Sequence, residues 1–237
     1  MNVAVIFAGG TGQRMNSKVL PKQFLEVHGK PIIIYTLEKF DQHEEIDGII
    51  IVCLNEWKSY LQNLLDKFGI KNVKAIVSGG DTGQMSIFNG ISKANEMFSS
   101  DDIVLLHDGV RPVIDKEIIS ENIACAKKNG CAVTVTPAIE TIAIKNDSTI
   151  KNIINRQNCW LAKAPQTFKL GEIYSAHLKA QADGRTDFID SASLMLNYGT
   201  ELYTVEGQPD NIKITTPSDY YIFKAMLDAR ENSQIWG

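Results

Sequence analysis

Short apolar runs alternate along the chain with stretches of helical spacing. The apolar runs contain no regular polar positions, which is typical of strands buried on both faces of a sheet. They predict strands at 2–7, 48–54, 74–77, 102–107 and 131–137. The helical spacing falls at 31–41, 55–68, 84–98, 115–129, 170–182 and 187–198. This alternation predicts an α/β fold of three layers, with helices on both faces of a mostly parallel sheet.

Several helix ends are marked by residues with known positional preferences. Pro31 suits the first turn of a helix, and Asn55 is a good N-cap. Gly130 suits the C-terminal end of the helix at 115–129. A last helix is predicted to start near Thr216, as N-cap, with Pro217 at its first position.

The pattern changes at 138–169, where short pieces alternate apolar and polar residues. Such alternation predicts an antiparallel ribbon with one exposed face. A small ribbon is rarely stable alone, so we expect it to pack on another surface, such as a second subunit. Strands at 201–206 and 212–214 are predicted after it. With no linker or repeat in the sequence, we expect one domain over 1–237 with an inserted β-arm at 138–169.

The composition limits the classes of ligand. The chain has 237 residues, 44% of them hydrophobic, which is enough to bury a substantial core. A net charge of −4 argues against non-specific nucleic-acid binding, so an anionic ligand must be held by local cations. No apolar run approaches the ~20 residues that span a bilayer. Together with the absence of a signal-peptide pattern, this predicts a cytoplasmic protein without a membrane partner.

Cysteines and histidines are dispersed. The four cysteines have no C-x-x-C spacing, which favours reduced thiols in a cytosolic protein. The four histidines are also far apart in sequence, which argues against a zinc site.

The first strand ends in small residues. Gly9 to Gly12 follow the apolar run directly, and Arg14 and Lys22 come shortly after. Small residues leave backbone N–H groups free to face anionic oxygens, with two cations close in sequence. The segment therefore predicts a site for nucleotide phosphates; the alternative is a glycine turn without a ligand.

Two better-known phosphate motifs do not fit this segment. A Walker A loop needs a lysine and then a serine or threonine after its last glycine, whereas Gln13, Arg14 and Met15 follow Gly12. Pro21 stands where the helix of a dinucleotide fingerprint would run. An NAD-dependent oxidoreductase is therefore disfavoured.

Polar clusters follow other predicted strands. They are 78–81 with Ser86, 107–112, and 210–213. Ligands of open parallel sheets bind outside the carboxyl ends of the strands, so these clusters should meet at one edge. The sequence therefore predicts a single composite site.

Three charged residues in these clusters allow alternative interpretations. Asp108 suits a Mg²⁺ ligand beside a triphosphate, or else an N-cap or turn residue. Arg111 suits a fork for a substrate phosphate, or a brace for its loop. Lys213, between Ile212 and Ile214, either pairs with Asp210 or faces an anionic ligand, because an unpaired buried ammonium is costly.

Five motifs occur in a fixed order over nearly the whole chain: AGGTGQRM…PKQF, GGD…S…NG, HDGVRP, R…W…PQTF and DNIKITTP…D. Together they resemble the cytidylyltransferases that join CTP to a polyol phosphate. One branch of that family acts on methylerythritol phosphate in isoprenoid synthesis, and another acts on ribitol 5-phosphate for cell-wall polymers. The resemblance implies a Rossmann-like nucleotidyltransferase that needs Mg²⁺.

The resemblance also implies a role for each matching residue. The CTP site would comprise Ala8, Gly9, Gly10, Thr11, Gly12, Gly80, Asp81, Ser86 and Asp108. The catalytic cations would be Arg14, Lys22 and Lys213. The acceptor would meet Arg111, Thr141, Arg156 and Asp210. Mg²⁺ would be held by Asp108 and Asp210. In this family the arm of one subunit reaches its neighbour, so the resemblance implies a homodimer in which Arg156 grips the phosphate in the partner's site.

The chain departs from the family pattern at several positions. Gly83 replaces an arginine, Glu140 an aspartate and Ile189 a threonine, while Lys163-Ala164 replaces Gln-Thr or Leu-Thr. Most of these changes concern the acceptor side. The motifs LPKQFL and IKITTP favour the ribitol phosphate branch, and Trp160 slightly favours the other.

The leading hypothesis is transfer of CMP from CTP to D-ribitol 5-phosphate. The alternatives are methylerythritol phosphate, another polyol phosphate, or a non-catalytic nucleotide-binding regulator.

Overall fold

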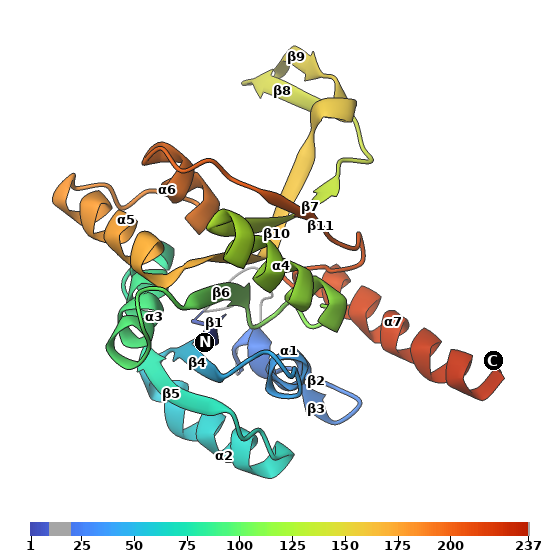
Figure 1. Ribbon diagram of the computed structural model, residues 1–237. Coiled ribbons are helices and arrows are strands. Elements are labelled where there is room, and N and C mark those ends of the chain that lie inside the picture. The colour runs from blue at the N-terminus through green and yellow to red at the C-terminus, as the bar shows by residue number, and fades with distance from the viewer. Residues whose placement is uncertain (10–19, 237) are drawn as a thin grey trace.

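A seven-stranded sheet forms the centre of the molecule (Figure 1). The computed structural model describes residues 1–9 and 20–236, with side chains up to residue 232. The strands lie in the order β11-β7-β10-β6-β1-β4-β5. Their bounds are β1 Asn2–Ala8, β4 Gly48–Cys53, β5 Val73–Ser78, β6 Ile103–Asp108, β7 Cys131–Pro137, β10 Trp160–Lys169 and β11 Thr204–Glu206. In this sheet β10 is antiparallel to both neighbours and the other pairs are parallel, so the predicted mostly parallel α/β fold is confirmed.

Helices cover both faces of the sheet (Figure 1). Strand β1 alternates between the two sides: Ala4 and Ile6 belong to one buried cluster, and Val3 and Val5 to the other. The first cluster includes α1 (Ile32–Asp41), α2 (Lys58–Phe68) and α4 (Lys116–Asn129). The second includes α3 (Gly83–Met97), α5 (Leu170–Ala182) and α6 (Ser191–Asn197). Burial of the central strands on both faces explains their unbroken apolar runs.

Helix α3 lies very close to the sheet at Gly90. A Cβ there would be 2.5 Å from Cγ1 of Val5 and 2.7 Å from Cγ2 of Val52. The small residue therefore lets the helix backbone approach β1 and β4. This contact fixes the direction in which the N-terminus of α3 meets the carboxyl ends of those strands.

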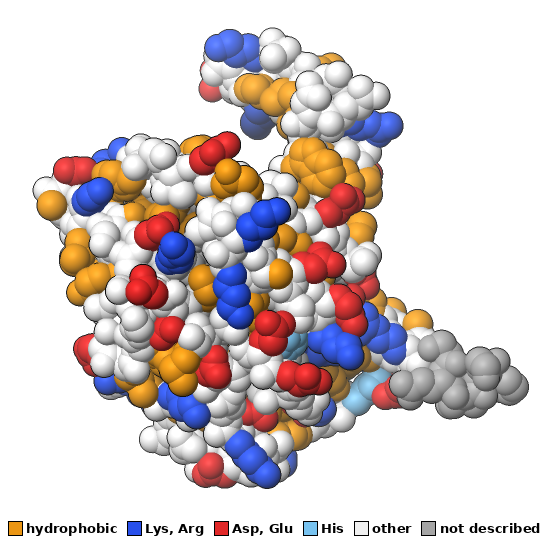
Figure 2. All heavy atoms as spheres, in the orientation of Figure 1, with side chains coloured by type: hydrophobic (Ala, Val, Ile, Leu, Met, Phe, Trp, Pro, Cys, Tyr) orange, Lys and Arg blue, Asp and Glu red, His pale blue; other side chains and the backbone are white. Residues whose placement is uncertain are grey.

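A hairpin projects from the sheet as a separate arm (Figures 1 and 2). It pairs β8 (Ile142–Asn146) with β9 (Thr149–Ile154), which confirms the antiparallel pairing predicted within 138–169. The region 160–169 instead belongs to β10 of the central sheet. Apolar side chains on and beside the arm are exposed, namely Ile139, Ile144, Ile150, Ile153, Trp160 and Leu161.

The last helix, α7 (Pro217–Trp236), is capped by its own first turn. The carboxylate of Asp219 accepts hydrogen bonds from the N–H groups of Thr215 at 2.8 Å and Thr216 at 2.7 Å. Phe223 packs with Ile214 in a small buried cluster beside Val110. The predicted helix start is confirmed, and the cluster anchors the segment just before it.

Several predicted boundaries are wrong. Asn55 lies in a short 3-10 helix, Asn55–Trp57, and α2 begins only at Lys58. The segment 212–214 is no strand; Ile214 donates one backbone hydrogen bond to Val110 and then meets α7. Strand β5 is only half-buried, because it lies at the edge of the sheet.

Other boundaries agree more closely. Gly130 ends α4 in the left-handed conformation with φ of 89°, as predicted. The predicted start of α6 at 187 is wrong: the helix begins at Ser191, because Asp190 caps it through the N–H of Ser193 at 2.8 Å. Among the described residues, no helix combines the length and apolarity needed to cross a membrane.

Candidate active site

The turn after β6 is fixed against the end of β1. Phe7 and Asp108 face each other in the parallel register. The N–H of Gly109 donates to the carbonyl of Phe7 at 2.9 Å, and the carbonyl of Gly109 accepts from Thr36 Oγ1 at 3.0 Å. A Cβ on Gly109 would lie 2.9 Å from that Phe7 oxygen, so the close approach requires glycine. The strand end therefore holds Asp108 in one orientation.

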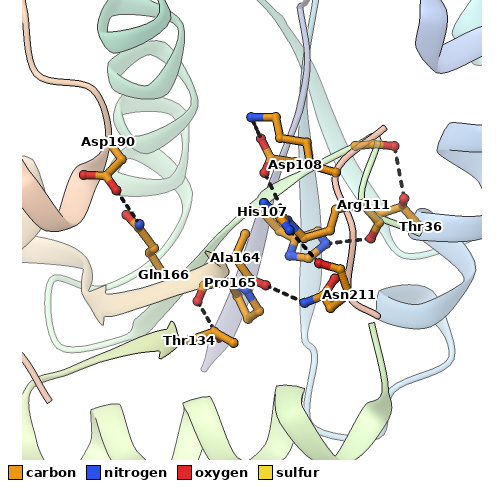
Figure 3. A network of polar contacts seen from close by, with 12 residues as sticks. Thr36, His107, Asp108, Arg111, Thr134, Ala164, Pro165, Gln166, Asp190 and Asn211 are labelled. Carbon is orange, nitrogen blue, oxygen red and sulfur yellow. Dashed lines mark hydrogen bonds and ion pairs between the residues drawn. The ribbon is translucent and has the colours of Figure 1, made fainter. Parts of the chain in front are cut away.

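Asp108 lies between two cations, one of which, Arg111, is seen beside it in Figure 3. Its Oδ1 is 2.6 Å from Lys213 Nζ, and its Oδ2 is 3.3 Å from Arg111 Nε. Burial raises the pKa of Asp108, but the charges of Lys213 and Arg111 outweigh it and leave the pKa below its ordinary value. The group is therefore a carboxylate at neutral pH.

Arg111 braces its loop. It is 8% exposed, and its Nη1 donates to the carbonyl of Asn211 at 2.7 Å. His107 Nε2 lies 3.1 Å from the Arg111 carbonyl. Arg111 therefore braces its loop (Figure 3), and its contact with the acceptor stays a prediction.

The partner of Lys213 is Asp108, so the alternative that Lys213 pairs with Asp210 is wrong. Asp210 Oδ2 instead lies 3.7 Å from Arg230 Nη2, on α7. The reason is topological: the parallel sheet brings the end of β6 to Lys213, while Asp210 faces the last helix.

A further cation, Lys163 on β10, lies at this site and was not among the predicted site residues. Its Nζ donates to the carbonyls of Pro209 at 2.8 Å and Gln208 at 3.4 Å. Asn211 Nδ2 returns a hydrogen bond to the carbonyl of Ala164 at 3.0 Å. Burial lowers the pKa of Lys163, and the charge of Arg111 lowers it further. The one sequence signal was the departure from the family pattern at this position.

Lys22 is presented by a short 3-10 helix, η2 (Lys22–Phe24). Gln23 Nε2 donates to the carbonyl of Ala8 at 2.6 Å, which ties this turn to the end of β1. Phe24 is 1% exposed and contacts Trp57 and Tyr60, with ring centroids 5.4 and 5.1 Å away. Ala8 and Gly9 lie at the same edge, whereas the predictions for Gly10, Thr11, Gly12 and Arg14 fall outside the described residues.

The third cluster follows β5. Ser86 Oγ accepts a hydrogen bond from the N–H of Gly80 at 3.0 Å, and the exposed Asp81 lies between them in sequence. A Cβ on Gly80 would be 2.5 Å from Met85 Cβ, so the turn needs glycine. Gly83 has no heavy atom within 4 Å of its added Cβ, which leaves an open position where the family has arginine.

The sequence-predicted residues of the arm lie elsewhere. Thr141 and Arg156 are exposed, and Arg156 Nη1 donates to the carbonyl of Ile139 at 2.7 Å. The arm stands away from the sheet edge in Figure 1. Within one chain, therefore, the structure brings together Asp108, Arg111 and Lys213 but not these two residues.

The carboxylates suit a divalent cation that is shared with a polyphosphate. In the described part of the chain, no group of three or more His, Cys, Asp or Glu side chains is arranged to hold a metal. Asp108 and Asp210 carry hard oxygen atoms, and Mg²⁺ commonly takes one or two carboxylates plus phosphate oxygens. Both oxygens of Asp108 face cations, so Lys213 would have to turn toward the phosphates.

Two buried histidines predict loss of stability in mild acid. Burial lowers the pKa of His107 and of His177 to about 4 each, against 6.5. The unfolded chain therefore takes up protons first, and the free energy of unfolding falls as pH drops from about 6.5 toward 4. We expect a loss of roughly 2 kcal/mol per histidine between pH 7 and 5. Urea unfolding of His177→Phe should show a clearly smaller loss; an undiminished one would contradict this assignment.

Comparison with known proteins places this geometry in a family. The family model described as IspD, 2-C-methyl-D-erythritol 4-phosphate cytidylyltransferase, matches residues 2–229. A ribitol-5-phosphate cytidylyltransferase of Streptococcus agalactiae serotype III is 52% identical over 238 residues, covering 100% of both chains. A 2-C-methyl-D-erythritol 4-phosphate cytidylyltransferase of Clostridium botulinum strain Langeland is 36% identical, covering 96% of this chain and 97% of its own.

Solved structures agree with these matches. The crystal structure of 4-diphosphocytidyl-2C-methyl-D-erythritol synthase from Anaerococcus prevotii has a TM-score of 0.81 at 28% identity, with 96% of each chain covered. The chain therefore belongs to the IspD family of cytidylyltransferases and is a nucleotidyltransferase enzyme.

Proposed function

We propose that this enzyme transfers CMP from CTP to D-ribitol 5-phosphate, giving CDP-ribitol and pyrophosphate. The relatives that carry this activity in their names reach 52% identity over the whole chain, against 36% for those named for methylerythritol phosphate. Similarity to these relatives supports the acceptor, and the charged residues of the site support the chemistry.

One observation carries the chemistry: cations gather at one edge of an acidic protein. The chain has a net charge of −4, yet Lys213 and Arg111 both pair with Asp108. A third cation, Lys163, contacts the segment that leads to Lys213. Such local charge suits a reaction that brings two anions together.

The proposed reaction needs positioning more than proton transfer. A phosphate oxygen of the acceptor attacks the α-phosphorus of CTP in line, the bond to the β-phosphate oxygen breaks, and pyrophosphate leaves. The attacking oxygen is already anionic, so no general base is required. Lys213 and Lys22 would neutralise charge that develops on the phosphates. A Mg²⁺ ion held by Asp108 and Asp210 would supply further charge neutralisation when bound.

The nucleotide would lie across the ends of β1 and β5. Ala8 and Gly9 would bring backbone to the phosphates, and Gly80, Asp81 and Ser86 would read the base. Ser86 Oγ accepts a hydrogen bond from the N–H of Gly80 at 3.0 Å and donates a longer one to the Gly80 carbonyl at 3.4 Å, so the position of the hydroxyl is fixed.

Pyrophosphate release with CTP and a panel of polyol phosphates tests the proposal. The panel contains the 5-phosphate of D-ribitol, 2-C-methyl-D-erythritol 4-phosphate, and the phosphates of xylitol and glycerol. The highest kcat/KM is expected with D-ribitol 5-phosphate. A higher value with methylerythritol phosphate would instead assign that reaction, which the family description also names. Pyrophosphate release with none of them would overturn the proposal.

We also propose a single-domain subunit that forms a homodimer through the arm. An isolated two-stranded hairpin is marginal in water, and this one exposes apolar side chains such as Ile150 at 64% and Ile153 at 60%. Covering them with a second subunit would bring Arg156 and Thr141 to the partner's site. The four free cysteines suit a reducing compartment, which supports the cytoplasm as the location.

Replacing Arg156 by alanine is expected to raise the acceptor KM about 10-fold while leaving the KM for CTP nearly unchanged. The guanidinium would meet the phosphate of the acceptor and not the nucleotide. Steady-state kinetics with each substrate varied in turn measures this split. An equal rise in both KM values would contradict the role.

Mixed dimers show whether Arg156 acts across the interface. In a heterodimer of Arg14→Ala and Arg156→Ala subunits, shared sites give one doubly changed site and one intact site. The purified heterodimer should then recover about half of wild-type activity. Sites confined to one subunit would leave both sites impaired, and no recovery would result.

A further inference from the structure

Lys163 is held in a defined position near Arg111 and Asp210. It lies on β10 at an irregularity between Ala162 and Gln166, where the register with β7 shifts. The strand is fixed just beyond it: Thr134 Oγ1 donates to the carbonyl of Pro165 at 2.8 Å, and Gln166 Nε2 donates to Asp190 at 2.9 Å (Figure 3). The half-buried side chain of Lys163 is therefore attached to a backbone that is held in place on its C-terminal side.

The contacts of Lys163 leave one hydrogen-bond donor of its ammonium for a ligand. An ammonium has three donors, and Lys163 uses two of them on the carbonyls of Pro209 and Gln208. The carbonyls orient Nζ without neutralising its charge. No ion-pair partner of Lys163 lies within 4.0 Å among the described residues. The third donor and the full charge are thus available for an anion.

The neighbouring charges favour an anion at this place. Arg111 and Asp210 both act on Lys163 through space; the charge of Arg111 lowers its pKa and that of Asp210 raises it, while burial lowers it most. Asp210 also pairs with another cation, since its Oδ2 lies 3.7 Å from Arg230 Nη2. Arg111 likewise pairs with Asp108, with 3.3 Å between Nε and Oδ2. A phosphate bound beside Lys163 and Arg111 would offset the repulsion between their two positive charges.

We propose that Lys163 is a specificity-determining residue of the acceptor site, where its ammonium binds the phosphate or an adjacent hydroxyl of the polyol phosphate. This assignment rests on the proposed function. A lysine here adds a charged donor to the acceptor side and recognises an anionic acceptor without contacting the nucleotide. It gives Lys163 a role different from that of Lys213, which faces Asp108.

Binding and turnover of Lys163→Met test the assignment. Methionine keeps the straight chain and removes the charge. With a non-reacting α,β-methylene analogue of CTP bound, calorimetry should show the Kd of D-ribitol 5-phosphate raised about 10- to 100-fold. The Kd of the analogue and kcat at saturating acceptor should stay within about twofold of wild type. Lys163→Arg should recover most of the acceptor affinity, because the charge returns.

The matched control is Lys169→Met at the end of the same strand, where the side chain is 42% exposed and its Nζ lies 4.0 Å from Glu172 Oε1. It should leave every constant unchanged. Lys163 could instead only hold the 208–213 segment in place. Its replacement would then displace Lys213, lower kcat and weaken binding of the CTP analogue. This result would overturn the proposal. Unchanged acceptor binding would overturn it as well.

Failure of the proposed function is distinguishable from failure of this inference. Wild-type turnover of D-ribitol 5-phosphate with an unaffected Lys163→Met contradicts the role of Lys163 alone. Binding that depends on Lys163 without any turnover contradicts the proposed reaction alone. A wild-type protein that binds no D-ribitol 5-phosphate contradicts both.

Discussion

Replacing Lys213 by methionine is expected to lower kcat about 100- to 1,000-fold, the usual range for loss of one preorganised charge-stabilising group. Lys213 Nζ lies 2.6 Å from Asp108 at the end of β6, where the triphosphate of CTP is proposed to lie. The expected loss is in kcat and kcat/KM together, since the charge acts mainly as pyrophosphate departs. Pyrophosphate release at saturating CTP and acceptor measures it.

The Lys213 variant should remain folded. Its side chain is 44% exposed, and Ile214 beside it, fully buried, anchors the segment. Asp108 keeps Arg111 as a partner at 3.3 Å. The control is Lys224→Met on α7, an exposed lysine with no assigned role. A Lys213 variant as active as this control would contradict the catalytic assignment.

Much of the fold was predictable because its signals are local. The apolar runs of β1, β4, β6 and β7 are buried on both faces, so no polar position interrupts them. Edge strand β5 was predicted from the same kind of apolar run, but its residues are only partly buried, and sequence alone does not distinguish the two cases. The capping preference of Asn55 predicts that α2 starts there, whereas a 3-10 turn precedes the helix in the structure.

The site was predictable as a set of strand-end clusters but not as a set of contacts. Parallel strands necessarily bring their carboxyl ends to one edge, which is why Asp108, Ser86 and Lys213 could be grouped from sequence. Pairing depends on long-range geometry. Lys213 meets Asp108 over a hundred positions away in the chain, and Asp210, its sequence neighbour, faces α7 instead.

Lys163 was missed for a related physical reason. The start of a strand antiparallel to its neighbours reaches the carboxyl edge of the parallel ones, so its residues belong to the site although none follows a parallel strand. A search restricted to segments after strands excludes it. The sequence shows that a lysine at position 163 departs from the family pattern. Only the structure shows the charged residues near it.

Replacing Lys22 by alanine is the other change expected to lower kcat about 100- to 1,000-fold. Lys22 lies on a turn whose neighbours are firmly held: Gln23 bonds to Ala8 at 2.6 Å, and Phe24 is buried against Trp57 and Tyr60. The turn should therefore keep its conformation without the lysine, and the loss should fall on the chemistry. Rapid-quench measurement of CMP transfer in a single turnover reports that step directly.

The control is Lys71→Ala, an exposed lysine on the loop before β5, and it should have wild-type activity and the same melting temperature as Lys22→Ala. If Lys22 and Lys213 stabilise the same triphosphate, the double variant should lose less than the product of the two single losses, because groups that act as a unit are not additive. Fully multiplicative losses would mean that the two lysines act at independent places, and would contradict a shared phosphate site between η2 and the end of β6.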